Sequence, residues 1–332
     1  MMENKYVKQF PDLMAGKTVM YVHGFGSSAQ TGTVSRLRQV LCNARVIAED
    51  VPLHPLEAID LLHRLCEKEQ PDLIIGTSMG GMYTEQLYGY DRIVINPAFR
   101  IADTMQAHGM TGAQTYFNPR KDGVQKFFVD NNIVKEYRLV SGQCFSGVTD
   151  EERHRVWGLF GDADTLVDTW DLFRQHYPTA IHFHGEHRVD DRSYMHAVMP
   201  VVRWIDDRQE GRQRPVVLIA TNSVVARNGE PRDNVQKTFR QLLETYDVHF
   251  VAPADFNARE AMAETITWLE RAFDAPAYNH VIFANDKQLL MGDYLIGTEP
   301  CDNFMGTMLT LGSEPFKTWN EVGEYFSRLG GQ

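Results

Sequence analysis

The sequence predicts an α/β protein with two units, each built on a mainly parallel β-sheet covered by helices. Short apolar β-runs alternate with helical stretches along the chain, a pattern typical of parallel strands joined by helices. The charged stretch DDRQEGRQR, with a central glycine, interrupts this pattern, and a new apolar run follows it directly. A length of 332 residues also suits about two domains. We therefore expect one unit over 1–208, a linker at 209–214 and a smaller unit over 215–332.

The first unit contains apolar runs that we expect to form strands. They are Val19–Val22, Arg45–Ile47, Leu73–Ile75, Arg92–Ile95, Val156–Phe160 and Ala180–Phe183. Helical stretches follow at about Thr33–Cys42 and Pro55–Lys68, the second with apolar residues at helical spacing. Residues from about 99 to 153 are less regular and rich in polar and aromatic side chains, which predicts a lid insertion. Tyr194–Ile205 can close the unit as a helix.

The second unit repeats the alternation on a smaller scale. Helical stretches are expected around Asn234–Glu244 and Arg259–Ala272. The predicted strands are Val216–Ala220, Val248–Val251, Val281–Phe283 and Met308–Leu311.

Composition excludes several classes of protein. The formal net charge of −11 argues against nucleic-acid binding and against adhesion to an anionic membrane, since both need a basic surface. No apolar run approaches the ~18 residues of a membrane span, and residues 1–17 lack the apolar core of a signal peptide. The four cysteines are far apart and favour a reducing compartment. We expect a cytoplasmic protein with no nucleic-acid partner and no membrane span.

The segment Gly76-Thr77-Ser78-Met79-Gly80 fits the G-x-S-x-G pattern of a nucleophile elbow. This pattern places a nucleophilic serine on a sharp turn between a strand and a helix, where Cβ atoms two residues away would clash. An apolar strand precedes the segment and a helical pattern follows it, as the elbow requires. The alternative is an ordinary glycine-rich turn. We interpret Ser78 as the nucleophile.

A serine nucleophile needs a base and an acid that orients the base, in the chain order serine, acid, histidine for this motif. Asp162, Asp164 and Asp168 all follow the predicted strand that ends at Phe160. We favour Asp164, because a loop can turn its carboxylate back towards the sheet edge. Asp162 is expected to cap the turn and Asp168 to begin the next helix.

The base should follow the last strand of the unit. His187, in Gly-Glu-His-Arg, occupies that place, and we predict that it is the base. His182 and His184 belong to or border the strand and look structural, and His196 lies within the predicted closing helix.

Backbone amides should stabilise the oxyanion that forms during acyl transfer. The amide of Met79 follows the nucleophile directly, and the loop after the first strand should supply a second donor. His23–Ser28, with the sequence HGFGSS, is that loop, and we predict the Phe25 amide as the donor. Alone, His23-Gly24 could equally be a tight turn with a histidine facing the core.

A zinc site is the main rival interpretation. His182–His187 reads H-x-H-x-E-H, a spacing that could bind zinc, as in the metallo-β-lactamase-like hydrolases. There the array lies early in the chain and needs downstream ligands, whereas here only His196, His249 and His280 follow it. We therefore predict no metal site.

Five blocks in this order resemble the small bacterial α/β-hydrolase esterases of the YqiA/YcfP type. The blocks are VMYVHGFGSS, PDLIIGTSMGGMYTEQL, IVINPAFR, GLFGDADTLVD and GEHR, and the resemblance spans about residues 18–206. It implies a carboxylic-ester or thioester hydrolase with Ser78, Asp164 and His187 as its triad and no cofactor. The segment 106–150 is where the resemblance is weakest.

The second unit resembles the haloacid-dehalogenase-like phosphatases, in particular their deoxyribonucleotidase-like branch. The resemblance rests mainly on Lys287–Thr298, which together with the preceding Asp286 has the sequence DKQLLMGDYLIGT. That family's nucleophile and acid/base aspartates would fall at Ala220 and Asn222, and its magnesium-binding acidic pair at Gly297-Thr298. Without these carboxylates, phosphoryl transfer loses its covalent chemistry and its charge neutralisation. The resemblance thus implies a catalytically inactive domain, in which Lys287 either remains as part of a phosphate site or is simply solvated.

We therefore expect a serine hydrolase acting on a small-molecule acyl ester or thioester. A non-catalytic binding protein and residual phosphatase activity in the second unit remain as alternatives. The acyl chain, the leaving group, homo-oligomerisation and any regulation by the second unit stay open at this point.

Overall fold

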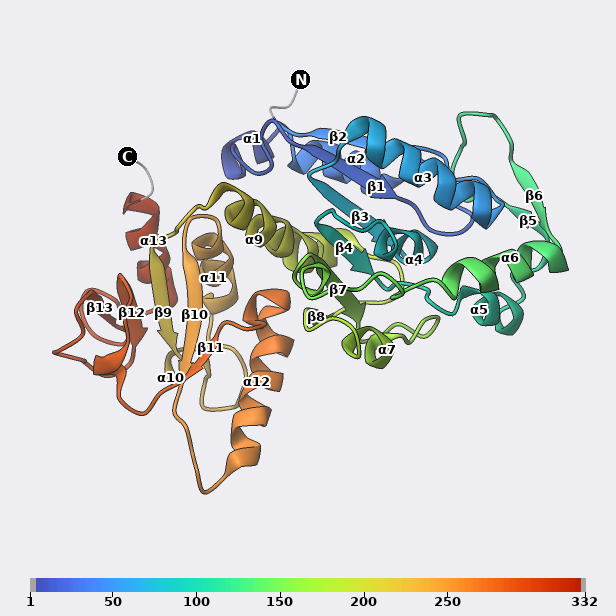
Figure 1. The fold of residues 1–332 in the computed structure, drawn as a ribbon. Helices are drawn as coiled ribbons and strands as arrows, with labels where there is room; N and C mark the ends of the chain where they lie inside the picture. The colour runs from blue at the N-terminus through green and yellow to red at the C-terminus, as the bar shows by residue number, and fades with distance from the viewer. Residues whose placement is uncertain (1–3, 330–332) are drawn as a thin grey trace. The chain divides into compact units, whose positions relative to one another are not determined.

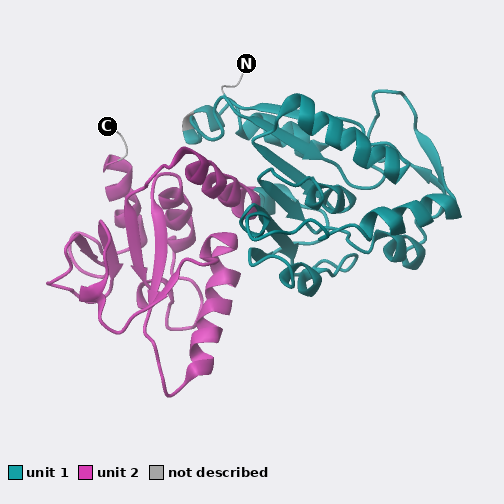
Figure 2. Ribbon diagram, viewed as in Figure 1, with its two compact units in different colours: residues 1–194 teal, residues 195–332 magenta. Residues whose placement is uncertain are grey.

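The computed structural model describes residues 4–329. Residues 1–194 and 195–332 form two compact units, which are coloured separately in Figure 2. The predicted division at 209–214 stays a prediction. Its first two residues complete helix α9 (Met199–Glu210), which ends at Gly211 in the left-handed conformation typical of a helix C-terminus.

The first unit is built on a six-stranded sheet with the strand order β2-β1-β3-β4-β7-β8, in which every neighbouring pair is parallel (Figure 1). Its strands are β1 (Thr18–Val22), β2 (Arg45–Ala48), β3 (Leu73–Thr77), β4 (Arg92–Ile95), β7 (Val156–Gly161) and β8 (Ala180–Phe183). Because all these strands run in one direction, their carboxyl ends meet at one edge of the sheet. This arrangement is the α/β-hydrolase fold that the sequence predicts.

Both faces of this sheet are buried. Met20, Ile74 and Val94 on one face pack in a single core with helices α3 to α7, and Ile75 and Ile93 on the opposite face are fully buried as well. Continuous apolar strands are what a sheet covered on both sides requires. The helices of this unit are α1 (Tyr6–Gln9), α2 (Gly32–Val40), α3 (Pro55–Glu69), α4 (Met79–Glu85), α5 (Ile101–Ala107), α6 (Asn131–Ser141), α7 (Trp170–Arg174) and α8 (Asp191–Ser193).

Local signals explain where several helices begin. The Thr31 hydroxyl accepts a hydrogen bond from the Val34 amide at 3.2 Å and caps α2. Pro55 occupies the first position of α3, where a missing amide hydrogen costs nothing. Asp130 caps α6 by accepting from two amides of its first turn.

The insertion between β4 and β7 contains α5, α6 and a two-stranded antiparallel hairpin, and ends in a 3₁₀ turn at Glu152–His154. The hairpin strands are β5 (Gly112–Thr115) and β6 (Lys126–Val129), which Figure 1 shows beside α6. The hairpin loop is held to the sheet edge: the Phe117 amide donates to the Gly26 carbonyl at 2.7 Å, and Asn118 Nδ2 donates to Ser27 Oγ at 3.1 Å. The predicted lid insertion therefore contacts the loop that follows β1.

The second unit contains a five-stranded parallel sheet with the order β11-β10-β9-β12-β13. Its strands are β9 (Val216–Ala220), β10 (Asp247–Ala252), β11 (Val281–Phe283), β12 (Tyr294–Gly297) and β13 (Thr307–Thr310). Its helices are α9, α10 (Thr221–Val224), α11 (Val235–Leu243), α12 (Arg259–Phe273) and α13 (Trp319–Leu329), with 3₁₀ turns at Ala275–Ala277 and Lys287–Leu289 and a π-helical turn over Tyr194–Val198 before α9. The predicted α/β class is confirmed for both units. Among the described helices, none has both the length and the apolar character that crossing a membrane requires.

Candidate active site

Ser78 lies at the turn between β3 and α4, in a backbone conformation that few residues other than glycine adopt. Its φ is 57° and its ψ is −120°. The two flanking glycines make this turn possible. A Cβ on Gly76 would lie 2.3 Å from the Gly80 carbonyl oxygen, and a Cβ on Gly80 would lie 2.1 Å from the carbonyl oxygen of Val22. The glycine spacing of the motif is thus a consequence of backbone packed directly against backbone.

The three side chains that are predicted to form a catalytic triad are joined by hydrogen bonds. The Ser78 hydroxyl lies 3.0 Å from His187 Nε2, and His187 Nδ1 lies 2.7 Å from Asp164 Oδ2. Ser78 follows β3, Asp164 follows β7 and His187 follows β8, so the common carboxyl edge of the sheet brings them together. The side chain of Asp164 is 3% exposed and that of His187 18%. This geometry allows His187 to receive the serine proton while Asp164 orients the imidazole.

Asp164 is held in its ionised form by its surroundings. Burial alone would raise the pKa of Asp164, but the hydrogen bond from His187 and two backbone amides outweigh it, so the pKa lies below its usual value. The amides are those of Leu166 and Val167, at 2.8 Å and 3.0 Å from Oδ1. An anionic carboxylate facing Nδ1 keeps the hydrogen on that nitrogen and leaves Nε2 as the acceptor.

The rejected candidates have other partners. Asp162 accepts from the Gly185 amide at 3.1 Å and lies 3.1 Å from His184 Nδ1, and His182 stacks on Trp170 with a centroid distance of 3.6 Å. The three histidines of the H-x-H-x-E-H array therefore point to three different partners. In the part of the chain that the structure describes, they do not form a set of metal ligands.

The proposed oxyanion donors flank the nucleophile. A Cβ on Gly24 would lie 3.4 Å from Ser78 Cβ, so the loop after β1 passes directly over the serine. Met79 is the first residue of α4, where amides have no acceptor within the helix. Within residues 4–329, neither the Phe25 amide nor the Met79 amide makes a hydrogen bond. Both amides remain predicted oxyanion donors.

His23 fixes the start of this loop, and its ring is buried, as the alternative of a histidine facing the core expects. It is 2% exposed, with Nδ1 donating to the Gly24 carbonyl at 2.8 Å and Nε2 accepting from the Val51 amide at 2.9 Å. Burial, assisted by the nearby Arg120 cation, lowers the pKa of His23 to about 4, although the Gly24 carbonyl and Asp50 act in the opposite direction. The neutral ring therefore anchors the loop that follows β1.

We expect this anchor to make the first unit sensitive to acid. Since the folded state holds His23 neutral, only the unfolded chain takes up a proton between pH 6.5 and pH 4, and stability falls as the pH falls. The loss should reach about 3 kcal/mol near pH 4. Urea unfolding of wild type and His23→Gln across this range measures it. The variant should be less stable at pH 7 but should depend less on pH, and equal slopes would contradict the expectation.

Aromatic side chains from the insertion surround the predicted donor Phe25. Its ring makes edge contacts with Phe127 of β6 and Tyr137 of α6, at centroid distances of 5.4 Å and 6.4 Å. The Tyr137 hydroxyl also donates to Met79 Sδ at 3.1 Å. The insertion therefore supports both sides of the predicted oxyanion site. The sequence alone could not reveal this, because these residues are far apart along the chain.

In the second unit, the positions that the phosphatase resemblance assigns to catalytic residues lie at the carboxyl edge of its sheet. Ala220 ends β9, Asn222 lies in α10 and Gly297 ends β12. The carbonyl of Asn222 accepts from Arg232 at 3.2 Å. Lys287 begins a short 3₁₀ turn that Asp286 caps through the Gln288 amide. Its predicted role in phosphate binding stays a prediction.

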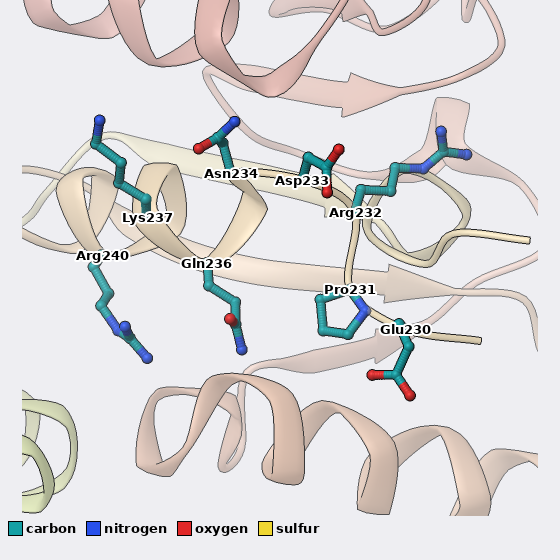
Figure 3. Close-up of a pocket in the computed structure, with 8 residues that line it drawn as sticks. All are labelled: Glu230, Pro231, Arg232, Asp233, Asn234, Gln236, Lys237 and Arg240. Carbon is teal, nitrogen blue, oxygen red and sulfur yellow. The ribbon is translucent and has the colours of Figure 1, made fainter. Parts of the chain in front are cut away.

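A cavity of about 580 Å³ lies around the segment that leads into α11 (Figure 3). Its lining carries the cations Arg232, Lys237 and Arg240. The carboxylates Glu230 and Asp233 lie among them. In the view of Figure 3, Lys237 extends upward from α11 and Arg240 extends downward.

Comparison with known proteins gives similarities over parts of the chain. A putative 5'(3')-deoxyribonucleotidase of Vibrio phage KVP40 is 26% identical over a part of this chain, 101 residues or 30% of its length. The match spans 59% of that relative's length.

Two solved structures are also similar. Est1E of Butyrivibrio proteoclasticus, with bound ferulic acid, is 14% identical over 61% of this chain and 92% of its own, with a TM-score of 0.41. A soluble variant of the monoglyceride lipase of Saccharomyces cerevisiae, with a substrate analogue, is 13% identical over 58% of this chain and 87% of its own, with a TM-score of 0.42.

The first unit also matches the sequence profile of a protein family. The match covers residues 18–197, which include the elbow and the segments that carry Asp164 and His187. The chain belongs to the uncharacterised protein family UPF0227.

Proposed function

We propose that the first unit is a serine hydrolase that cleaves a carboxylic ester or thioester of a small molecule, like the YqiA/YcfP-type esterases that it resembles. The observation that carries the proposal is the chain of hydrogen bonds from Ser78 through His187 to Asp164, with the serine on a strained elbow. A structural serine would need neither this conformation nor this base. The esterase and the lipase named above are consistent with the same class of reaction.

In the first half of the reaction, His187 Nε2 takes the Ser78 proton as the serine oxygen attacks the acyl carbon. The negative charge that develops on the carbonyl oxygen is stabilised by the amides of Met79 and Phe25. The bond to the leaving alcohol or thiol then breaks, and His187 returns the proton to that group. The product of this half is an acyl ester on Ser78.

In the second half, water resolves this acyl-enzyme. His187 removes a proton from the water molecule, the hydroxide attacks the acyl carbon, and the acid leaves as Ser78 regains its proton. Throughout both halves, Asp164 remains ionised and stabilises the imidazolium. The proposed chemistry uses only groups of this chain and requires no metal or cofactor. The four cysteines of the chain, none in a disulfide, favour a cytoplasmic location.

A fluorophosphonate probe tests the proposal directly, because it reacts with activated serines and not with ordinary ones. Wild type should be labelled at Ser78, and Ser78→Ala should not be labelled. Ser35→Ala is a matched control in helix α2, where the serine hydroxyl donates only to the Thr31 carbonyl, and it should retain the label. Wild type without label, or Ser78→Ala with undiminished label, would show that Ser78 is not an activated nucleophile.

Hydrolysis of short p-nitrophenyl esters separates an enzyme from a binding protein with the same fold. We expect turnover by wild type and an acyl-enzyme burst in the first turnover. A labelled Ser78 without ester or thioester turnover would overturn the substrate class while leaving the nucleophile in place.

The second unit is proposed to be a haloacid-dehalogenase-like domain without phosphatase activity, with a binding, regulatory or structural role. The support is chemical: Ala220 and Asn222 stand where carboxylates would be needed, and Gly297-Thr298 offers no acidic metal ligand. Magnesium-dependent phosphate release from nucleotides, lost in Lys287→Ala, would overturn this assignment.

A further inference from the structure

Three metal-ligating side chains converge in the second unit, at a place that the proposed hydrolase does not use. Asp247, His249 and His280 each offer one ligand atom, and the three atoms lie within 4.8 Å of one another. Asp247 Oδ2 lies 3.0 Å from His249 Nε2, and Asp247 Oδ1 lies 3.6 Å from His280 Nε2. The two histidine rings are 4.7 Å apart between centroids.

The sheet topology explains this convergence. Asp247 and His249 belong to the first half of β10, and His280 directly precedes β11. These strands are parallel neighbours, so both groups lie at the amino edge of the sheet. The altered phosphatase positions lie at the opposite, carboxyl edge. The cluster is therefore separate from the site that the family resemblance indicates.

The environment of His280 prepares it to act as a ligand. Its Nδ1 lies 2.6 Å from the Tyr278 carbonyl, so Nδ1 carries the hydrogen and Nε2 has an open lone pair. Its ring also stacks on Trp204 at 4.8 Å with an angle of 15°, which fixes its plane. Metal-bound histidines commonly donate their second ring hydrogen to a backbone carbonyl in this way.

The contact between His280 and Asp247 then joins two acceptors. A neutral Nε2 lone pair faces a carboxylate oxygen, and neither group can donate a hydrogen to the other. A cation between them would satisfy both. His249 can join by holding its hydrogen on Nδ1 instead of Nε2, since both tautomers of a neutral imidazole are accessible.

Distances and ligand types favour a transition metal. Zinc bound tetrahedrally at about 2.0–2.1 Å from each ligand separates the ligand atoms by about 3.3–3.4 Å. The separations from Asp247 to the two histidines, 3.0 Å and 3.6 Å, lie on either side of that value, and all three ligand atoms lie within 4.8 Å of one another. Two imidazoles and one carboxylate suit zinc, whereas magnesium and calcium need oxygen ligands.

Within the described part of the chain, the carboxylate of Asp247 is not neutralised by a neighbouring cation and can attract a metal ion. Arg214 is the nearby cation, but its guanidinium is bound in a bidentate manner by Asp207, at 2.5 Å and 2.9 Å. The side chains are also accessible: Asp247 is 40% exposed, His249 23% and His280 17%. An ion can therefore reach the cluster from solvent.

We propose that Asp247, His249 and His280 form a binding site for one divalent transition-metal ion, with Zn²⁺ as the best match. The site has three protein ligands and leaves a fourth position open to water or to an anionic ligand. Because the ligands join the starts of β10 and β11, binding also stabilises the folded second unit.

Calorimetric titration of the metal-free, full-length protein with ZnCl₂ tests this site, with MgCl₂ as a comparison. Wild type should bind one Zn²⁺ per chain and should not bind Mg²⁺ measurably. Asp247→Asn and His249→Gln should each weaken Zn²⁺ binding by at least about tenfold. Both variants keep the shape of the side chain, and thermal unfolding without metal establishes that they are folded.

His184→Gln is the matched control, because His184 also pairs with an aspartate but, among the described residues, does not belong to a group of three ligands. It should bind Zn²⁺ as wild type does. Wild type without Zn²⁺ binding, or folded Asp247→Asn and His249→Gln with undiminished binding, would overturn the proposal. Loss of binding in His184→Gln alone would overturn it too, since the metal would then belong to the histidine array of the first unit.

Discussion

Asp164→Asn should lower kcat for ester hydrolysis by about 10⁴-fold while leaving the protein folded. The asparagine can still accept the amides of Leu166 and Val167 through its oxygen, so the loop keeps its shape. Its amide group, however, would face His187 Nδ1 with hydrogens. The imidazole would then carry its own hydrogen on Nε2 and could not accept the Ser78 proton. Steady-state kinetics on a p-nitrophenyl ester measure the effect.

Asp162→Asn is the matched control for this prediction. Asp162 follows the same strand and also lies beside a histidine, but that histidine is the exposed His184, whose side chain is 58% exposed. Its substitution should change kcat by no more than about twofold, since it touches neither Ser78 nor His187. If Asp162→Asn lowered kcat as strongly as Asp164→Asn, the prediction that Asp164 is the acid of the triad would be wrong.

The sheets and the candidate triad could be predicted because their signals are local. An apolar run such as Arg92–Ile95 or Ala180–Phe183 is bounded by polar or turn residues, and the structure has both strands with these bounds. In a parallel sheet, the residue that follows each strand lies at the same edge. Strand ends alone therefore bring Ser78, Asp164 and His187 together, without knowledge of any distance.

Other elements could not be predicted, because tertiary contacts define them. The sequence analysis did not identify β12 as a strand, since Tyr294–Gly297 is only four residues long and follows Gly292 and an irregular segment. The hairpin of the insertion, Gly112–Thr115 with Lys126–Val129, lacks a continuous apolar run and faces solvent in part. Its attachment to the loop after β1 depends on hydrogen bonds that join residues about ninety positions apart, such as Asn118 to Ser27.

The cluster of the second unit was missed for a related reason. In the sequence, His249 and His280 are only two distant histidines that follow the array of the first unit. They meet because β10 and β11 are neighbours in the sheet, with Phe250 in register with Val281. Nothing in the sequence marks Asp247 as a metal ligand, because a single aspartate at the start of a strand is common. Strand order, which the sequence did not supply, decides which side chains converge.

Gly80→Ala should destabilise the first unit by at least about 3 kcal/mol and abolish hydrolysis. The added Cβ would lie 2.1 Å from the Val22 carbonyl oxygen and 2.7 Å from that of His23. Both atoms are backbone, so no side-chain rotation relieves the overlap. Helix α4 would have to move away from the end of β1, and the Met79 amide and Ser78 would move with it. For a unit of this size, the midpoint of thermal unfolding should fall by about 6–12 °C, measurable by circular dichroism.

Gly32→Ala separates this steric effect from the general effect of replacing glycine. Gly32 is the first residue of α2, and no atom lies within 4 Å of the position that its Cβ would take. Alanine there should stabilise the protein by up to about 1 kcal/mol, because it restricts the unfolded chain and favours the helix. The two substitutions should therefore shift the midpoint in opposite directions. A Gly80→Ala protein as stable and as active as Gly32→Ala would mean that α4 does not pack on the end of β1, and the geometry proposed for the oxyanion site would fail with it.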